Sequence, residues 1–528
     1  MRTAQLLSAV VFTSIAWLGI GCGTSNSGGP GGGGGGDGGG GSGSSAGSGS
    51  ASGGIIGNSG GSGGSCLTCG GPSQPMVACA QGSGKQCQDP NCPAGSDTTI
   101  SGQVFDPAGA NPVYGVAVYV PSTPLQPLPQ GVSCNGCADL YSGTPIAATV
   151  TDADGKFKVP NAPHGMNVPL VVQIGKWRKL YSVPNVVECQ DNSASVKLSL
   201  PSKNNPMDPT VGDIPNIAIA TGGLDSLECL LLRMGVDKSE YTNDPAGMSP
   251  AGQIKIFPGY NGASMPGPSA VPSQQLWDSV PDLSRYDVVL LSCEGRETVD
   301  GPTQGATSLL DTDRQNLLSY SNMGGKVFAS HYHYAWFNSG PFYTATNPPF
   351  ATWLTGSNSI DDSKSFGAQV QTNLNNGSGM FPEGVAMKQW LGNVGALDNN
   401  GEVQIFQTRH NVSKINSVPG VQTWLTLDQA SPVPGAVEYF SIDAPIGAVS
   451  TESACGRVVY SDLHVSGGPG MGVDGQPPDY PNTALTIVPD QCAMHPLTPQ
   501  EKALEFMIFD LSSCLVPPNM PPKIPMTF

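Results

Sequence analysis

Short runs of alternating apolar and polar residues characterise residues 98–200. Thr99–Phe105 and Val113–Val120 follow this pattern of period two, which places one face of each strand in a core. Ala147–Val159 contains two such runs around an Asp–Gly pair, so we expect a hairpin there. A further strand is expected over 167–174. This region is therefore predicted to be all-β.

The pattern changes over residues 214–515, where mostly apolar strand-like runs alternate with helix-like segments. The apolar runs are typical of parallel strands that are covered on both faces. They are Asn216–Thr221, Tyr286–Gly295, Lys326–Ser330 and Gly456–His464. The expected helices are Leu227–Met234 capped by Asp225, Asp311–Met323 ended by two glycines, and Ala503–Leu511 after a Thr498–Glu501 capping box. This order predicts an α/β doubly wound, mostly parallel sheet, with its ligands at the carboxyl ends of the strands.

The N-terminal segment has the features of a secretion signal. Leu6–Ile20 is apolar but too short to anchor the chain as a membrane span. The ending of 1–22 resembles a bacterial lipobox, which implies lipidation of Cys22 and, because Gly23 follows, the outer membrane. Residues 23–65 are almost wholly Gly and Ser, so we expect a disordered tether. The predicted location is the cell envelope, where a lipid anchor would hold the protein to the membrane. The alternative is that the protein is secreted.

Charge excludes one class of partner. The net charge is −17, with only 23 lysines and arginines in 528 residues. Because a phosphate backbone repels such a chain, no nucleic acid partner is expected.

Thirteen of the fourteen cysteines follow Cys22, and they fall into two groups. Eight lie between 66 and 189, including a small Cys-rich segment at 66–97. Two C-x-x-C pairs in this group allow a zinc site, but disulfides fit an oxidising compartment better. For the second group we expect Cys229–Cys293 and Cys455–Cys514 disulfides, because each pair falls at one edge of the predicted sheet. Cys492 is then the odd thiol.

Two family resemblances follow from these segments. ISGQVFDPAG, GVAVYV, TDADGKFKVPNAPHG and VPLVVQIG, all within 98–200, resemble the carboxypeptidase-regulatory or transthyretin-like β-sandwich, a non-catalytic module. The YDVVLL strand, the helix ended by Gly-Gly, the strand before two histidines and GRVVYSDLH resemble the class I glutamine amidotransferase-like fold of the trehalose-utilisation type. That family has a cysteine nucleophile on a sharp turn after the strand that ends here at Ser330, and this chain has no cysteine there, so the resemblance implies no glutaminase activity. A Pro-rich tail, 516–528, ends the chain.

Polar residues at the ends of the predicted parallel strands form the candidate site. They are Ser330, His331, His333, Glu294, Asp462 and His464. In extended segments residues two apart share a face, so His331 and His333 are expected to point together, as are Asp462 and His464. With His464 and Asp462, the histidine pair would suit zinc or iron. Ser330 with His464 as base and Asp462 or Glu294 would instead form a nucleophilic triad, although no G-x-S-x-G elbow is present.

Two functions stay open on this evidence. The first is a surface-displayed lipoprotein whose amidotransferase-like domain binds a carbohydrate or cell-surface ligand without catalysis and without a cofactor. The second is an extracytoplasmic hydrolase, metal-dependent or serine-type, acting on carbohydrate around His331, His333 and His464. A metal-dependent hydrolase would require zinc or another divalent ion.

Overall fold

The computed structural model describes residues 92–93, 96–134, 141–243, 252–267, 271–297, 309–343, 349–448, 454–465 and 487–527. The predicted signal peptide with Cys22, the tether and nearly all of the Cys-rich segment lie outside the described residues, so these stay predictions. No helix in the described ranges is long and apolar enough to cross a membrane.

Two small sheets are formed by the first eight strands. These strands are β1 (Thr99–Phe105), β2 (Ala117–Pro121), β3 (Pro145–Val150), β4 (Lys156–Val159), β5 (Gly165–Ile174), β6 (Trp177–Val186), β7 (Asp191–Ser193) and β8 (Leu198–Ser199). One sheet has the order β3-β2-β5-β6, and the other has the order β4-β1-β7 with β8 also paired to β1. Val118 and Val120 of β2 enter the same core as Ile100 and Phe157 of the facing sheet, whereas Tyr119 faces the opposite way. The small sheets are thus sandwich-like.

The expected hairpin over Ala147–Val159 is wrong. The turn itself is present, because Asp152 N donates to Lys156 O over 2.9 Å. However, β3 pairs with β2 and β4 pairs with β1, so the strands on either side of the turn enter different sheets. The alternating pattern indicated two strands but carried no information about their partners.

A large sheet of ten strands follows, in the order β10-β11-β9-β12-β13-β20-β19-β18-β15-β16. Neighbours from β10 to β20 are parallel, and those from β20 to β16 are antiparallel. The strands are β9 (Ile217–Thr221), β10 (Tyr241–Thr242), β11 (Ile254–Pro258), β12 (Val288–Leu291), β13 (Lys326–Ser330), β15 (Ser365–Val370), β16 (Val403–Phe406), β18 (Val421–Leu427), β19 (Val437–Ala444) and β20 (Gly456–Ser461); β14 (Ala351–Trp353) and β17 (Val412–Ile415) form a separate pair. The prediction that the folded chain has more than one part, and that β-sheets dominate it, is confirmed.

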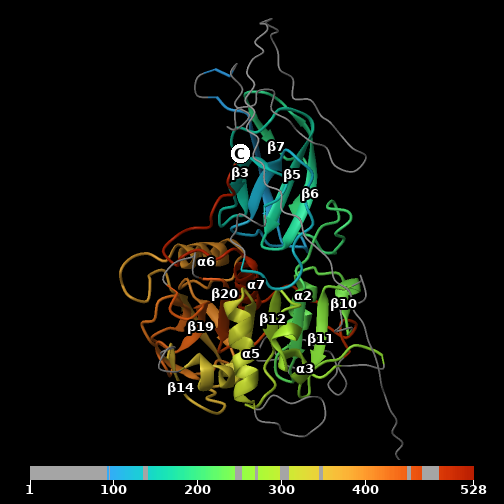
Figure 1. Ribbon diagram of the computed structural model, residues 1–528. Helices are drawn as coiled ribbons and strands as arrows, with labels where there is room; N and C mark the ends of the chain where they lie inside the picture. The colour runs from blue at the N-terminus through green and yellow to red at the C-terminus, as the bar shows by residue number, and fades with distance from the viewer. Residues whose placement is uncertain are drawn as a thin grey trace, which may run out of the picture. The chain divides into compact units, whose positions relative to one another are not determined.

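Helices cover both faces of the large sheet, and Figure 1 shows α5 lying across one of them. The helices are α2 (Leu227–Arg233), α3 (Gln274–Trp277), α4 (Val280–Leu283), α5 (Asp311–Asn322), α6 (Pro382–Asn393) and α7 (Pro499–Ser512), with 3₁₀ turns η1 (Lys238–Glu240), η2 (His331–Trp336) and η3 (Gly340–Phe342). In β12, Val288 and Leu290 pack on the side of α2 and α7, while Val289 and Leu291 pack on the side of α3, α4 and α5. Cover on both faces explains why these strands are wholly apolar.

Two predicted helix caps have different outcomes. Thr498 Oγ1 accepts a hydrogen bond from Glu501 N, and Glu501 Oε2 accepts one from Thr498 N, so the capping box of α7 is confirmed. For α2 the cap residue is Ser226 and not Asp225. Asp225 instead accepts from Val465 N over 2.9 Å, which ties it to the segment after β20.

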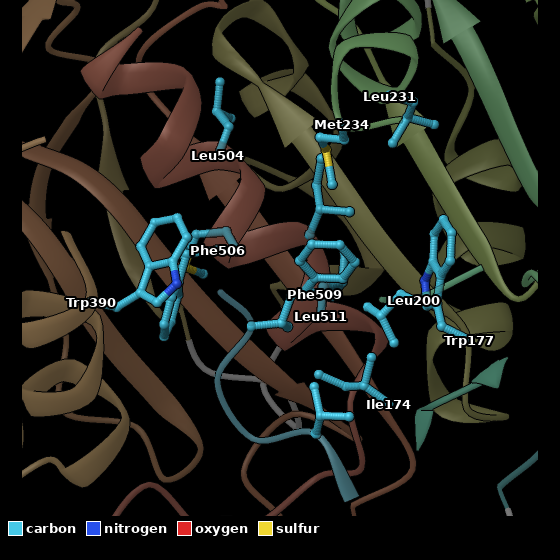
Figure 2. Packing of buried hydrophobic residues seen from close by; sticks show 14 of the residues in the cluster. Ile174, Trp177, Leu200, Leu231, Met234, Trp390, Leu504, Phe506, Phe509 and Leu511 are labelled. Atoms are coloured by element: carbon cyan, nitrogen blue, oxygen red, sulfur yellow. The ribbon is translucent and has the colours of Figure 1, made fainter. Parts of the chain in front are cut away.

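The core of the small sheets is continuous with one face of the large sheet. Figure 2 shows Ile174 and Trp177 of the small sheets beside Phe509 of α7, with Trp390 of α6 nearby. The Trp177 and Phe509 rings meet edge to face with centroids 5.9 Å apart. A Cys134–Cys455 disulfide, with α-carbons 4.7 Å apart, also links the two parts.

The predicted disulfide partners in the second cysteine group are wrong. Cys229 bonds to Cys492, and Cys455 bonds to Cys134, while Cys293 is a free thiol. Cys229 and Cys492 share the core on one face of the sheet. Cys293 faces His331 at the sheet edge, so it cannot meet Cys229. In the first group, Cys92–Cys189 confirms the expected disulfide chemistry and links the end of the Cys-rich segment to the small sheets.

Candidate functional site

Four neighbouring parallel strands, β9, β12, β13 and β20, end at one edge of the large sheet. Asp225 follows β9, Cys293 follows β12, His331 follows β13 and His464 follows β20. Because these strands are parallel and in register, the segments that follow them lie together at this edge. All four side chains are buried.

Cys293, His331 and His464 form a compact group, which we call the edge triplet. Cys293 Sγ lies 3.4 Å from His331 Nδ1. The rings of His331 and His464 have centroids 5.1 Å apart and planes at 69°. One ligand atom from each residue lies within 4.8 Å of the other two. A thiolate and two imidazoles are a ligand set that zinc and copper accept, so the edge triplet could bind a metal.

Hydrogen bonds fix the proton on each imidazole of the edge triplet. His331 Nε2 lies 3.1 Å from Ser357 O, and because a carbonyl only accepts, Nε2 carries the proton. His464 Nδ1 lies 3.3 Å from Gln407 Oε1 and donates to it. The lone pairs are therefore on His331 Nδ1, which faces Cys293, and on His464 Nε2. Within the described residues this buried Nε2 has no hydrogen-bond partner. Metal-binding histidines have this arrangement, in which the other ring nitrogen donates to an oxygen.

All three groups of the edge triplet are neutral near pH 7. Burial, with the Arg409 charge as a second cause, lowers the pKa of His331 to about 3. Burial, followed by the neighbouring His331 and Arg409, lowers the pKa of His464 well below its usual value. Burial raises the pKa of the Cys293 thiol to about 12. A neutral thiol beside a neutral imidazole is a poor nucleophile, which argues against a Cys–His catalytic pair.

The backbone after β13 separates His331 from His333. His331 has a φ of +42°, a conformation that few non-glycine residues adopt, and it begins the 3₁₀ turn η2. Successive residues of a 3₁₀ turn lie about 120° apart, so residues two apart diverge. The expectation that His331 and His333 point together is wrong, because it assumed an extended segment.

His333 is held by hydrogen bonds on both ring nitrogens. Its Nδ1 accepts from Trp336 Nε1 over 3.1 Å, and its Nε2 donates to Ser292 O over 2.8 Å. The ring therefore offers no free lone pair. This excludes His333 as a metal ligand in this arrangement and makes it a residue that fixes the η2 turn.

Ser330 is not placed as the nucleophile of the predicted triad. Its Oγ accepts from Cys293 N over 2.9 Å and also contacts the carboxyl of Asp225. Within the described residues no hydrogen bond joins Ser330 to a histidine. Burial raises the pKa of Asp225 to about 6, although the hydrogen bonds from Ser330 and backbone N–H groups oppose this.

The two predicted carboxylates also have other partners. Asp462 Oδ2 accepts from Asn411 N over 2.6 Å and from Val412 N over 3.2 Å, and Oδ1 contacts Tyr460 OH. Glu294 accepts from Tyr260 N over 3.1 Å. In the part of the chain that the structure describes, neither joins the edge triplet. Asp462 thus anchors the segment before β17, and its predicted role as a metal ligand is not supported.

Sequence analysis missed several residues of this edge. Cys293 was assigned to a disulfide, although its place directly after an apolar strand, like that of His331, is the signal that could have revealed it. Gln407 and Ser357 orient the two rings, and no local motif marks either residue. Arg409 is buried near both rings, and its guanidinium contacts Asp362.

Comparisons with known proteins add little. No family model matches the chain, and no curated protein matches it. Three solved structures align weakly with parts of the chain. Two are type II cohesin–X-dockerin complexes from Acetivibrio cellulolyticus, a C-terminal interface mutant (13% identity, 27% of this chain, 74% of that chain, TM-score 0.15) and an N-terminal one (13%, 26%, 85%, 0.16). The third is a cytoplasmic protein from Salmonella typhimurium (12%, 48%, 88%, 0.25). TM-scores this low support no argument about fold or function.

Proposed function

We propose that this protein is a metal-binding lipoprotein of the cell envelope, in which Cys293, His331 and His464 hold a soft transition-metal ion, most simply zinc. The observation that carries this proposal is the orientation of the two imidazoles. In each ring one nitrogen donates its proton to an oxygen, so the lone pair of the other nitrogen is available to a metal. A lone pair on a fully buried nitrogen without a partner is costly unless something binds it.

The spacing of the edge triplet supports zinc. Bonds of about 2.3 Å to sulfur and 2.0–2.1 Å to nitrogen place tetrahedral ligand atoms roughly 3.3–3.6 Å apart. The 3.4 Å between Cys293 Sγ and His331 Nδ1 fits this edge of a tetrahedron. Metal binding would also replace the thiol proton, since the thiolate is the ligand.

The topology supports the wider assignment. The chain runs from β9 outward to β11 on one side and then returns to β12 on the other side, so the strand order reverses between β9 and β12. A doubly wound sheet places its ligand near such a point. We therefore propose an amidotransferase-like doubly wound domain whose ancestral nucleophile position, on the turn after Ser330, holds no cysteine, carried with a β-sandwich on a lipid-anchored tether at Cys22. Binding to a carbohydrate or other cell-surface ligand remains part of this proposal.

A hydrolase is the second candidate, because three protein ligands leave a fourth zinc position for water. Burial disfavours it: His331 and His464 are each 1% exposed and Cys293 is fully buried, so a substrate has little access to these side chains.

Metal content tests the proposal directly. Untagged protein should retain about one zinc per chain after dialysis, measured by mass spectrometry of the elements. Cobalt substitution should give a thiolate-to-cobalt absorption band. Cys293→Ser and His464→Phe should lose both signals, whereas the control His410→Gln, outside the triplet, should keep them. Stoichiometric metal in Cys293→Ser would overturn the proposed site. Zinc-dependent ester hydrolysis that disappears in the same variants would favour the hydrolase instead.

A further inference from the structure

A second candidate site lies far from the edge triplet, where the small sheets meet α6 and α7. A cavity of about 40 Å³ lies here, partly open to solvent. Its walls come from the segment before β2, from both helices and from the C-terminal tail. Its lining includes Tyr114, Glu383, Trp390, Phe506, Asp510 and Lys523.

Aromatic rings form much of the wall of this cavity. Tyr114 and Phe506 stack with centroids 6.0 Å apart and planes at 12°, and Trp390 lies 5.6 Å from Phe506. Figure 2 shows Trp390 and Phe506 side by side. Such walls favour the alkyl part of a ligand and also attract a cation.

Glu383, at the first turn of α6, supplies the polar group. Its side chain is 3% exposed, and its Oε2 has no hydrogen-bond partner within the described residues. Arg457 Nη1 is 3.7 Å from this oxygen, too far for a hydrogen bond. The guanidinium is already committed to Asp443 at 2.8 Å and to Asp510 at 3.0 Å. The Glu383 carboxyl lines the cavity and, within the described residues, its Oε2 makes an ion pair with Arg457 but no hydrogen bond, so this carboxyl can still accept one.

The charges around Glu383 do not balance. Three carboxyls, Glu383, Asp443 and Asp510, share two cations, Arg457 and Lys326. Burial first, and then Asp510, raises the pKa of Glu383 well above its usual value, so a proton supplies the missing positive charge. Tyr114 faces Glu383 and is not a source of charge, since burial raises its pKa as well. Lys523 lines the cavity from the tail but is exposed to solvent.

We propose that this cavity binds a slender primary alkylammonium group, with the alkyl chain against Tyr114, Trp390 and Phe506 and the ammonium on Glu383. The ammonium takes the place of the proton on the carboxyl, so one proton leaves to solvent for each ligand bound. The same chemistry belongs to free alkylamines and to lysine side chains of another protein.

Calorimetric titration with n-butylammonium chloride tests the proposal, with 1-butanol as the neutral isostere. We expect butylammonium to bind at least about tenfold more tightly, because a charge-assisted hydrogen bond replaces a neutral one. Titrations at pH 7 in two buffers of different ionisation enthalpy should show close to one proton released per ligand. Equal affinity for amine and alcohol, or no proton release, would overturn the proposal. This readout does not depend on a variant or on metal.

Variants assign the proton to Glu383. Glu383→Gln keeps the shape of the side chain and should abolish both the tenfold preference and the proton release, while a melting curve confirms that the variant is folded. The matched control is Glu402→Gln, a buried carboxyl that does not line the cavity, and it should retain both. Proton release that survives in Glu383→Gln would indicate Lys326 as the source of the proton and would overturn the proposed site. N-acetyl-lysine amide, tested beside butylammonium, distinguishes the sources: comparable binding favours a lysine side chain, and exclusion favours a free amine.

Discussion

The two ends of the same parallel strands are stabilised in opposite ways. At their amino ends, Lys326 of β13 and Arg457 of β20 lie among carboxylates, and Arg457 pairs with Asp443 and Asp510. At their carboxyl ends, burial keeps His331, His464 and Cys293 neutral. The side chains in both regions are largely buried, and an uncompensated charge is costly in such a place. At the amino ends the buried charges are paired with opposite charges. At the carboxyl ends the side chains are neutral, and their lone pairs can bind a metal.

Removal of the cation at the amino end should have the largest effect. Arg457→Met leaves buried carboxylates without their partner, so we expect a loss of about 3–5 kcal/mol in the free energy of unfolding. Urea denaturation measures it. The exposed pair Arg285–Asp282 provides the control, since Arg285→Met should cost at most about 1 kcal/mol. Equal losses in the two variants would contradict the charge-paired description of this end.

At the carboxyl end, stabilisation should depend on metal. Zinc at 100 times its dissociation constant should raise the free energy of unfolding by about 2.7 kcal/mol. His464→Phe should abolish this increase but should change the metal-free protein by only about 1 kcal/mol, because among the described residues Gln407 is the one side chain that hydrogen-bonds to His464. Thermal melting with and without zinc measures both. A large loss in the metal-free variant would indicate a structural role in place of a ligand role.

The pH dependence of metal affinity should report the neutral state of the edge triplet. The Cys293 pKa of about 12 means that zinc must displace one proton, while the lowered histidine pKa values mean that no other proton leaves. Between about pH 6 and 9, affinity should therefore rise tenfold, or about 1.4 kcal/mol, per pH unit. Chelator competition gives the slope. A slope near two would show that an imidazole is protonated in the metal-free protein.

Glu383 should change the pH dependence of stability in the direction opposite to that of the metal site. Because its folded pKa is raised, it contributes stability below its unfolded pKa, near 4.5, and that contribution is lost as pH rises. Glu383→Gln cannot ionise, so between pH 5 and 8 its stability should fall less than that of the parent protein, by about 1.4 kcal/mol for each pH unit over which the buried Glu383 stays protonated. Parallel urea series across this range measure the difference. Parallel decline in both proteins would place the titrating group elsewhere, with Asp510 as the first alternative.

Local sequence determined the elements that carry the site. Apolar runs gave β9, β12, β13 and β20 close to their observed bounds, and the capping box at Thr498 began α7 where expected. These signals succeed because hydrogen bonding, periodicity and burial of a strand or helix are decided within a few residues. The edge at which Ser330, His331 and His464 gather followed from the parallel order of those strands.

Only the tertiary structure decided which atoms meet at that edge. The left-handed backbone conformation of His331 directs His333 away from it. Ser357 and Gln407, from distant segments, accept hydrogen bonds and so determine which ring nitrogens keep their lone pairs. The same holds for Cys229, which meets Cys492 across a separation of 263 residues in place of the expected Cys293. Such choices depend on side-chain packing between segments far apart in the chain, and strand and helix periodicity contains no information about it.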